Sequence, residues 1–339
     1  MENVINWEKP DTGLCNQILQ VSMKDRYLGS DLSAVNLFLL KDKYDIEIAE
    51  LSLEVPEGAR ETKETNKVYL RYYNGKAENR HGYGYPIYET TSKEEEEVIV
   101  KEALRLILSD ANNNNRTLRF CLCKEEQCEK LNKALKELCP GKEFGWIMSD
   151  NDADYILNKK SWSHYVGKKF ASKRNMVNTF IRNNPNWFYE EINKDKFIKY
   201  QREYMEKLST EWFESHDVEE DDMLTEERIS LKHMIDNFNE LMLVGGILYA
   251  DKDKPAAFMI GSRISEKVYD AHFEKGLDEY VAKGAFVLLN KCFASSEALA
   301  ECEYINVEED VGISGLRKMK LSYHPEIILK KFYGGLKDE

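Results

Sequence analysis

The sequence predicts an α/β protein in which short antiparallel strands and a closing strand–helix–strand unit share a mixed sheet. Segments with the two-residue alternation of a half-buried strand recur between segments with the apolar spacing of a helix. Turns rich in Gly, Pro and Asn separate these segments. The order strand, helix, strand over 117–148 returns over 304–332, each time after a hairpin and a longer helix. We therefore expect an internal duplication of one α/β unit.

The first elements follow from capping and alternation. A helix over 30–41 is expected to start at Ser30 or Asp31 as its N-cap. Residues 44–48 alternate apolar and acidic side chains, which predicts a strand, and 68–73 is a second strand candidate. The stretch 80–88 contains several Gly and Pro residues and is expected to be a loop.

The next unit begins with a helix over 94–108, whose acidic first turn complements the helix dipole. The asparagine run at 112–115 ends it. A strand over 117–123 is followed by a helix over 124–138 with apolar residues at helical spacing. A strand over 142–148 closes this half.

The second half starts with helices. We expect a helix over 165–182, ended by Pro185, and two further helices over 195–208 and 225–239. The acidic segment 215–222 between the last two is expected to be a solvated loop.

A hairpin then leads into the closing unit. Two strands flank a turn of alternating Asp and Lys, which is a hairpin pattern. The remaining elements in order are strands 243–249, 256–262 and 268–274, a helix over 284–299, a strand over 304–307, a helix over 315–321 and a strand over 327–332.

Length and charge limit what the protein can do. A chain of 339 residues predicts about two domains, which we place at 1–150 and 151–339. The net charge of −13 excludes binding of nucleic acid or anionic membrane over the whole surface, so any such contact is local. The longest apolar run, 241–250, is too short to span a bilayer, and the N-terminus lacks the pattern of a signal peptide. We expect a cytoplasmic protein with no transmembrane segment.

Several common site patterns are missing. The sequence has no GxxxxGK[ST] loop, no HExxH and no GxSxG. Its seven cysteines are an odd number, which fits a reducing compartment, and they include no paired CxxC. We expect no metal site, although Cys121, Cys123, Cys128 and Cys139 are the alternative candidates. Each of the six histidines is expected to be structural or at the surface.

One window of the chain is strongly basic. Between Tyr155 and Tyr189 there are seven Lys or Arg residues interleaved with aromatic residues and no carboxylate. Such a window suits a partner rich in phosphate or carboxylate groups. Lys169 and Lys173 lie four apart in the predicted helix and would share one of its faces.

A second candidate site lies over 306–323. Three carboxylates at a strand end precede a Gly-flanked loop and a short helix that carries Arg317, Lys318 and Lys320. The C-terminal end of a strand is where α/β sheets bind ligands. A purely structural cluster of salt bridges remains the alternative.

Three segments together resemble a known family. They are GKKFASKRNMVNTFIRNNPNW, LMLVGGILYADKDKPAAFMIG and YINVEEDVGISGLRKMKLSYHP. The resemblance is to the bacterial phosphatidylglycerol lysyltransferase C-terminal domain in a stand-alone, membrane-free form, and it covers 25–335. It implies two tandem GNAT-like, acetyltransferase-type domains related to the Fem-type aminoacyltransferases. Those enzymes move an aminoacyl group from a charged tRNA to an amine or hydroxyl.

The resemblance implies an acyltransferase with aminoacyl-tRNA as its donor and no required cofactor. Its partners would be the tRNA acceptor end and a small-molecule, peptide or lipid acceptor, the last with peripheral membrane contact. Glu274 and Glu308 are candidate general bases, and Lys320 is a candidate for stabilising the oxyanion. The candidate substrate-binding residues are Lys168, Lys169, Lys173, Arg174, Asn175, Asn306, Arg317, Lys318 and Tyr323.

Two other functions stay open. A CoA-dependent N-acetyltransferase would carry [Q/R]xxGx[G/A] before a helix whose amides bind pyrophosphate. At 281–286 the sequence is VAKGAF, so only Lys283, Gly284 and the helix N-terminus remain as candidate cofactor-binding groups. The third candidate is a non-catalytic module that binds tRNA or a metabolite.

Overall fold

The computed structural model describes residues 5–24, 27–54, 65–75, 80–90, 92–194, 197–215 and 222–337. Their contacts form two compact units. Unit 1 consists of Met1–Asp154, Glu309–Ile313 and Ile328–Glu339, and unit 2 of Tyr155–Glu308 and Ser314–Ile327. The acidic loop expected at 215–222 lies almost wholly outside the described residues.

Unit 1 contains most of the elements of the first half. Its helices are α1 (Thr12–Ser22), η1 (Ser30–Leu32), α2 (Ala34–Leu39), α3 (Lys93–Asn113) and α4 (Glu125–Leu138). Its strands are β1 (Ile46–Glu54), β2 (Thr65–Tyr73), β3 (Gly82–Tyr83), β4 (Ile87–Tyr88), β5 (Arg119–Cys123), the first part of β6 (Phe144–Asn158) and nearly all of β12 (Ile327–Leu336).

The sheet of unit 1 is mixed. Its strand order is β1-β2-β3-β5-β12-β6, with β4 paired to β2. The pairs β1–β2 and β12–β5 are antiparallel, whereas β3–β5 is parallel. The pairing of β12 with β5 corrects the expected division at 1–150 and 151–339, because it puts 328–339 into unit 1.

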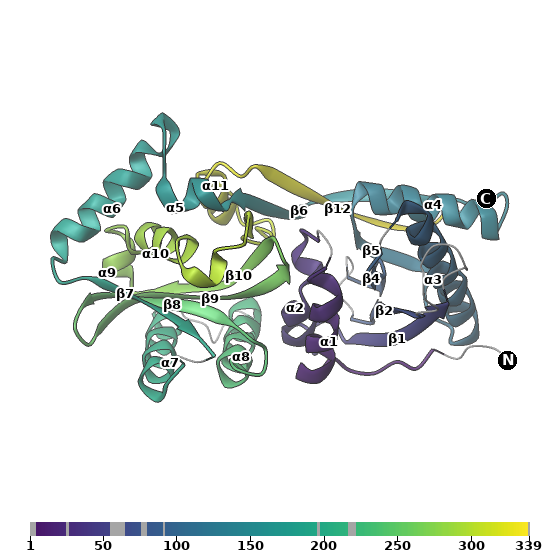
Figure 1. Cartoon of the computed structure of the whole chain (residues 1–339), viewed down its shortest axis with the longest axis horizontal. Helices are drawn as coiled ribbons and strands as arrows, with labels where there is room; N and C mark the ends of the chain where they lie inside the picture. The colour runs from purple at the N-terminus through teal and green to yellow at the C-terminus, as the bar shows by residue number, and fades with distance from the viewer. Residues whose placement is uncertain are drawn as a thin grey trace. The chain divides into compact units, whose positions relative to one another are not determined.

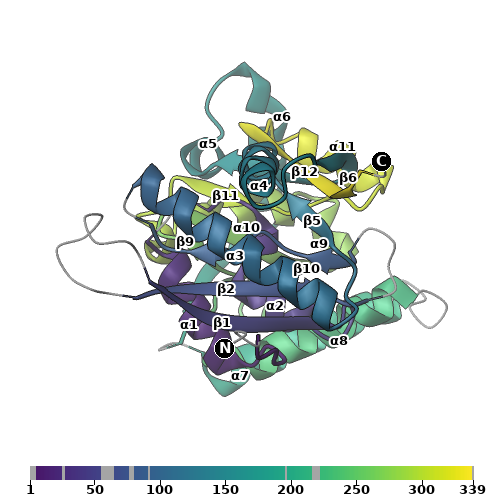
Figure 2. The same ribbon diagram turned by 90° about the vertical axis from the view of Figure 1, so that its right-hand side faces the viewer.

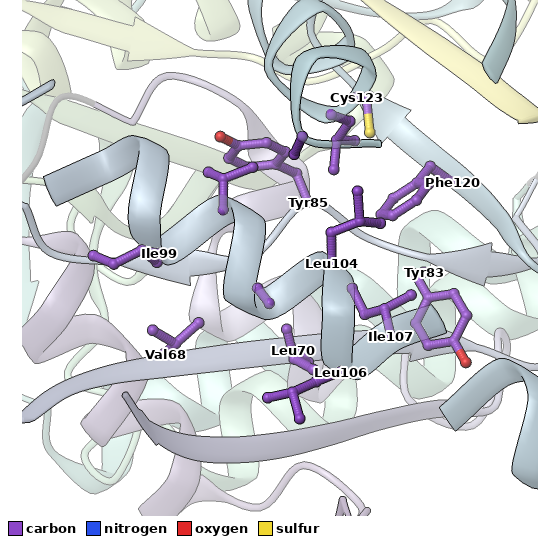
Figure 3. Packing of buried hydrophobic residues seen from close by; sticks show 14 of the residues in the cluster. Val68, Leu70, Tyr83, Tyr85, Ile99, Leu104, Leu106, Ile107, Phe120 and Cys123 are labelled. Carbon is purple, nitrogen blue, oxygen red and sulfur yellow. The ribbon is translucent and has the colours of Figure 1, made fainter. Parts of the chain in front are cut away.

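The core of unit 1 lies between α3 and the sheet. Figures 1 and 2 show α3 along one face of the strands and α1 and α2 on the other. Figure 3 shows Leu104 and Ile107 of α3 packed with Val68 and Leu70 of β2 and with Phe120 of β5, all of them buried. The apolar residues that recur at helical spacing in α3 therefore form one face of the helix. This face packs against the alternating inward-facing residues of the strands.

A set of charged side chains is also buried in unit 1. Lys331 of β12 donates hydrogen bonds to Asp154 Oδ1 at 2.6 Å and to Ser30 Oγ at 3.1 Å. Asp154 also accepts from the backbone N–H of Ser30 at 2.7 Å. Burial lowers the pKa of the Lys331 amine, but the negative charges of Asp154, Glu309 and Asp31 together outweigh it and raise that pKa above its ordinary value. The pair therefore holds the last strand of the chain in unit 1.

Unit 2 contains the second set of elements. Its helices are α5 (Lys159–His164), η2 (Lys168–Phe170), α6 (Ala171–Asn183), α7 (Lys199–Glu214), α8 (Asp222–Asp236), α9 (Asp278–Val281), α10 (Ala285–Ala294), η4 (Glu297–Leu299) and α11 (Ser314–Leu321). Its strands are the end of β6, β7 (Phe188–Asn193), β8 (Val244–Asp251), β9 (Lys254–Ser265), β10 (Val268–Gly276) and β11 (Tyr304–Asn306).

The sheet of unit 2 is mixed as well. The strand order is β6-β11-β10-β9-β8-β7, and β10–β11 is its parallel pair. Figure 1 shows α7 and α8 on one face of these strands and α10 on the other. Leu289 and Phe293 of α10 are buried against Leu248 of β8 and Tyr269 of β10.

The two units repeat one order of elements. Two helices precede antiparallel strands, after which come a helix, a strand, a helix and a strand: α1 to β6 in one case and α7 to β12 in the other. The predicted α/β class with a mixed sheet and two tandem GNAT-like units is therefore confirmed.

Three local predictions need correction. The expected helix over 165–182 is interrupted, because Tyr165 is left-handed at φ 51° and α6 begins only at Ala171. Lys169 therefore lies in η2 and does not share a face of α6 with Lys173. The expected loop at 80–88 contains the short strands β3 and β4, and the helix α1 and strand β7 had not been predicted.

Candidate functional site

The site in unit 2 begins where two parallel strands part. β10 pairs with β11 only from Val268 to Asp270, because β11 ends at Asn306 while β10 continues to Gly276. A register shift between β10 and β9 follows, between Ala271 and Phe273. Side chains on the second half of β10 thus stand at the C-terminal end of a parallel pair, the usual ligand position in such sheets.

Glu274, in this part of β10, is a carboxyl group in a buried environment. Its Oε1 atom is buried and accepts no hydrogen bond from the described residues. Burial raises the pKa of Glu274 to about 8, although Asn290, Lys173 and Lys275 oppose the shift. Near neutral pH this group can therefore both hold and accept a proton.

Lys173 brings a cation to the same place from α6. Its Nζ atom donates a hydrogen bond to Ser322 Oγ at 2.8 Å and lies 3.5 Å from the centroid of the Tyr323 ring. Burial lowers the pKa of Lys173 to about 8, against the negative charge of Glu274. The ammonium of Lys173 can therefore lose its proton more readily than that of an exposed lysine.

Asn290 and Tyr323 connect these two groups. The side-chain nitrogen of Asn290, on α10, donates to the hydroxyl of Tyr323 at 3.1 Å. Asn290 is buried, and its Oδ1 atom accepts no hydrogen bond from any described residue. The Tyr323 ring packs edge-on against Trp162 with centroids 5.6 Å apart and lies 6.4 Å from the Tyr165 ring. We call Lys173, Glu274, Asn290 and Tyr323 the Glu274 cluster.

The Glu274 cluster can transfer protons, and it can bind a substrate group that donates hydrogen bonds. A carboxyl and an amine with similar pKa values can serve as acid and base in one reaction. The oxygens of Glu274 and Asn290 that accept no hydrogen bond from described residues can take one from the N–H or O–H of a substrate.

A second cluster surrounds His272. Its Nδ1 atom lies 3.0 Å from Glu308 Oε1 and 3.6 Å from Asp270 Oδ2, and its Nε2 atom lies 2.8 Å from Ser262 Oγ. Glu308 has a left-handed backbone at φ 59°, and its N–H donates to Asn306 Oδ1 at 2.7 Å. We call Ser262, Asp270, His272 and Glu308 the His272 cluster. Its Asp, His and Glu side chains could hold a metal ion.

The basic window contains exposed residues, one of which also anchors the backbone. Lys168, Lys169, Arg174 and Asn175 are exposed. Arg174 donates from Nη1 to the backbone oxygens of Tyr165 and Gly167, at 2.5 and 2.7 Å, and so holds the turn before α6. Lys168 and Lys169 are thus presented to solvent, whereas Arg174 stabilises the chain locally.

The charged residues after β11 are divided between the two units. Glu309 belongs to unit 1, where it accepts a hydrogen bond from Arg80 at 2.5 Å. In α11, Lys318 is exposed, Arg317 is half-buried, and Lys320 is buried with its Nζ 6.0 Å from the centroid of the Tyr155 ring. Lys320 is thus a sheltered cation of unit 2.

The N-terminus of α10 is closely covered. Lys283 is exposed, and its N–H donates to Tyr280, while the N–H of Gly284 donates to Val281, both at 3.0 Å. Gly284 has φ 103°, and a Cβ atom there would lie 2.5 Å from the carbonyl oxygen of Met176 on α6. The amides of Lys283 and Gly284, two of the groups expected to bind a pyrophosphate, therefore already have acceptors.

Lys173, Glu274 and Tyr323 were each predicted from the sequence as candidate site residues, and they lie together in the structure. Asn290, which was not predicted, lies with them. Asn290 could have been noticed because, together with Lys291, it interrupts the apolar residues of α10, AFVLLNKCFA. His272 could have been noticed because Asp270, His272 and Glu274 alternate along one strand. All seven cysteines, including the four weighed as metal ligands, are free thiols.

Comparison with known proteins identifies the family. The family model "Phosphatidylglycerol lysyltransferase, C-terminal" matches residues 27–333. A conserved protein of unknown function from Bacteroides thetaiotaomicron is 27% identical, covers 98% of this chain and 100% of its own, and superposes with a TM-score of 0.79. The structure of L-PGS from Bacillus licheniformis is 14% identical over 98% of this chain and 94% of its own, with a TM-score of 0.60.

A C-terminal domain (DUF2156) from Agrobacterium fabrum gives the same TM-score of 0.60 at 10% identity, over 97% of this chain and 93% of its own. A search of curated proteins gave no match. In the described part of the chain, no helix has the length and apolar character needed to cross a bilayer. Because the family model covers most of its length, the chain belongs to the family of the phosphatidylglycerol lysyltransferase C-terminal domain.

Proposed function

We propose that this protein is an acyltransferase that moves an aminoacyl group from aminoacyl-tRNA to the amine or hydroxyl of an acceptor. The observation that carries the proposal is the Glu274 cluster, in which Glu274 and Lys173 both have a pKa of about 8. Membership of a lysyltransferase family and the likeness to the L-PGS structure support the donor class.

The reaction needs one base and one acid. Glu274 accepts the proton of the acceptor's amine or hydroxyl as its nitrogen or oxygen attacks the carbonyl carbon of the aminoacyl ester. A tetrahedral intermediate forms, and the nearby cation of Lys173 stabilises its oxyanion. The carbon–oxygen bond to the ribose then breaks, the ribose oxygen takes a proton from Lys173, and Lys173 recovers it from Glu274.

Glu274 is the better candidate for the base than Glu308. The carboxylate of Glu308 is engaged with His272 at 3.0 Å, whereas Oε1 of Glu274 accepts no hydrogen bond from described residues. Lys320 remains a second candidate for stabilising the oxyanion, because its burial would strengthen such an interaction.

The N-terminus of α10 favours a tRNA donor over acetyl-CoA. A pyrophosphate at Gly284 would meet amides already bonded to Tyr280 and Val281 and the carbonyl oxygen of Met176. The exposed Lys168 and Lys169 offer contacts for tRNA phosphates instead. We further propose a cytoplasmic protein whose acceptor is a small molecule, a peptide or a lipid at a membrane surface.

The test uses tRNA charged with a labelled mixture of amino acids, incubated with the full chain and pooled acceptors. We expect label to move from tRNA to an acceptor with the wild type and at a rate about 100-fold lower with Glu274→Gln. A parallel assay supplies acetyl-CoA and follows free thiol. Turnover of acetyl-CoA alone would replace the proposal with the N-acetyltransferase. Binding of tRNA without transfer from any donor would replace it with the non-catalytic module.

A further inference from the structure

We propose that Asp270, His272 and Glu308 form a binding site for a divalent transition-metal ion of the Zn²⁺ class. This inference goes beyond the proposed acyl transfer, and it does not depend on it. The three residues come from two different segments, the bulged strand β10 and the turn that follows β11.

The separations of the ligand atoms fit one ion. His272 Nδ1 lies 3.0 Å from Glu308 Oε1 and 3.6 Å from Asp270 Oδ2, and all three atoms lie within 4.8 Å of one another. An ion with metal–ligand bonds of about 2.0–2.2 Å holds neighbouring ligand atoms about 3.0–3.5 Å apart. A small rotation of Glu308, the most exposed of the three, brings its oxygen to the same ion.

Ser262 gives the His272 imidazole a hydrogen-bond partner on the side away from the proposed metal. Its Oγ lies 2.8 Å from His272 Nε2, on the side of the ring away from the two carboxylates. When Nε2–H donates to this hydroxyl, the lone pair of Nδ1 points toward Asp270 and Glu308. Metal-binding histidines commonly donate their other nitrogen to such a partner.

Burial gives the site one open side. The side chains of Asp270 and His272 are 0% and 1% exposed, whereas that of Glu308 is 25% exposed. Three protein ligands with one accessible side resemble a catalytic type of zinc site, in which water or substrate completes the coordination. The left-handed backbone of Glu308, held by the contact of its N–H with Asn306, turns this ligand back toward β10.

The donor set selects the class of metal. An imidazole nitrogen with two carboxylate oxygens suits Zn²⁺, Co²⁺ or Mn²⁺, whereas Mg²⁺ and Ca²⁺ prefer oxygen ligands alone. Among these ions Zn²⁺ binds such sites more tightly than Mn²⁺ or Co²⁺. We therefore name Zn²⁺ as the ion and Co²⁺ as its spectroscopic probe.

The experiment measures metal binding and not acyl transfer. A negative result would therefore count against the metal site without counting against the proposed function. The full chain is stripped with a chelator and titrated with Zn²⁺ by calorimetry and with Co²⁺ by visible absorption. We expect one saturable site, a rise in melting temperature with Zn²⁺, and no such site in His272→Ala. Ser262→Ala should weaken Zn²⁺ binding about 10- to 100-fold, because the imidazole loses the partner that orients it.

Two further variants keep the test sharp. Glu308→Gln keeps the size of the side chain and should also weaken Zn²⁺ binding, and it serves as the ligand variant if His272→Ala does not fold. His81→Ala, at a histidine of unit 1, is the control and should bind Zn²⁺ like the wild type. A wild type without saturable binding at micromolar Zn²⁺, or variants that all bind equally, would overturn the metal site and leave His272 as a hydrogen-bond donor to Glu308.

Discussion

The ammonium of Lys173 lies 3.5 Å from the centroid of the Tyr323 ring, although the two residues are far apart in the chain. The contact joins α6 to the segment after α11, and the hydrogen bond from Lys173 to Ser322 reinforces it. Cation–π contacts of this kind contribute about 0.5–2 kcal/mol, more as water is excluded. The same contact keeps the cation of Lys173 close enough to Glu274 to affect its pKa.

Lys173→Met tests the cation of the Glu274 cluster. The variant keeps much of the side-chain volume but loses the positive charge, so we expect aminoacyl transfer to fall by about 100-fold. The pKa of Glu274 should rise further, because Lys173 opposes its upward shift. The check is a pH–rate profile. The limb on which the rate rises with pH reports the ionisation of the general base, and it should move to higher pH. A variant with an unchanged rate and profile would show that Lys173 only supports packing.

Glu274→Gln tests the buried carboxyl through stability. In the folded chain its pKa is about 8, whereas an unfolded carboxyl titrates near its ordinary value of about 4.3. The folded state therefore holds a proton that the unfolded state has released, and this contribution to stability is lost as pH rises from about 4.3 to about 8. Glutamine carries no such proton.

We therefore expect the stability of Glu274→Gln relative to wild type to increase between pH 5 and pH 8, as measured by urea midpoints. The comparison with wild type cancels the titration of other groups. A difference that stays constant over this range would mean that the pKa of Glu274 is not raised in the folded chain, and it would remove the near-neutral pKa on which the acid–base role is argued.

The sequence was sufficient for most elements because their periodicity is local. Leu131 and Leu135 mark the buried face of α4, and the alternation in β10 marks its strand. The pairing of β12 with β5 could not be found this way, because strand partners far apart in sequence leave no local pattern. The boundary of unit 2 was misplaced for this reason.

The site was predictable only in part. Lys173 and Arg174 are adjacent and were both expected to bind substrate, but successive residues of a helix point about 100° apart. Lys173 consequently turns toward Tyr323, while Arg174 turns toward the backbone of Tyr165. Asn290 was missed because two adjacent polar residues, Asn290 and Lys291, leave the apolar pattern of α10 recognisable and do not show which of them is buried.

Lys168 and Lys169 test the tRNA contact. Replacing both with Ala should weaken tRNA binding. It should also make the slope of log K against log salt concentration less steep, by the amount expected for the loss of about two phosphate contacts. Their exposure predicts an unchanged melting temperature. The matched control replaces Lys101 and Lys133, two exposed lysines of unit 1, and should leave both binding and slope as they are. Equal effects in the two double variants would point to net charge alone.

Arg174→Ala tests an anchoring role. The variant loses two hydrogen bonds to the backbone oxygens of Tyr165 and Gly167, so we expect a loss of about 1 kcal/mol in unfolding free energy. Transfer should decline through looser placement of the turn before α6. Asn175→Ala, at the exposed neighbour, is the control and should keep its stability. A variant of Arg174 with unchanged stability but weaker tRNA affinity would return this residue to the substrate-binding set.

Lys331 and Asp154 test how the last strand is held in unit 1. Both side chains are almost completely buried and 2.6 Å apart, so Lys331→Met leaves the carboxylate of Asp154 without its cation. We expect Lys331→Met to cost about 3–5 kcal/mol of unfolding free energy, because a buried charge loses its compensation. The double variant Lys331→Met, Asp154→Asn should lose less unfolding free energy than the two single variants lose together, because no uncompensated charge is then buried.

The control for Lys331→Met is the same substitution at a surface ion pair. Lys101 pairs with Glu137 at 2.7 Å, but their side chains are 42% and 48% exposed, so Lys101→Met should cost less than about 1 kcal/mol. Urea unfolding of all four variants measures these differences. Additive effects of the Lys331 and Asp154 substitutions would mean that the two groups do not interact, and β12 would then be held by its backbone pairing with β5 and β6.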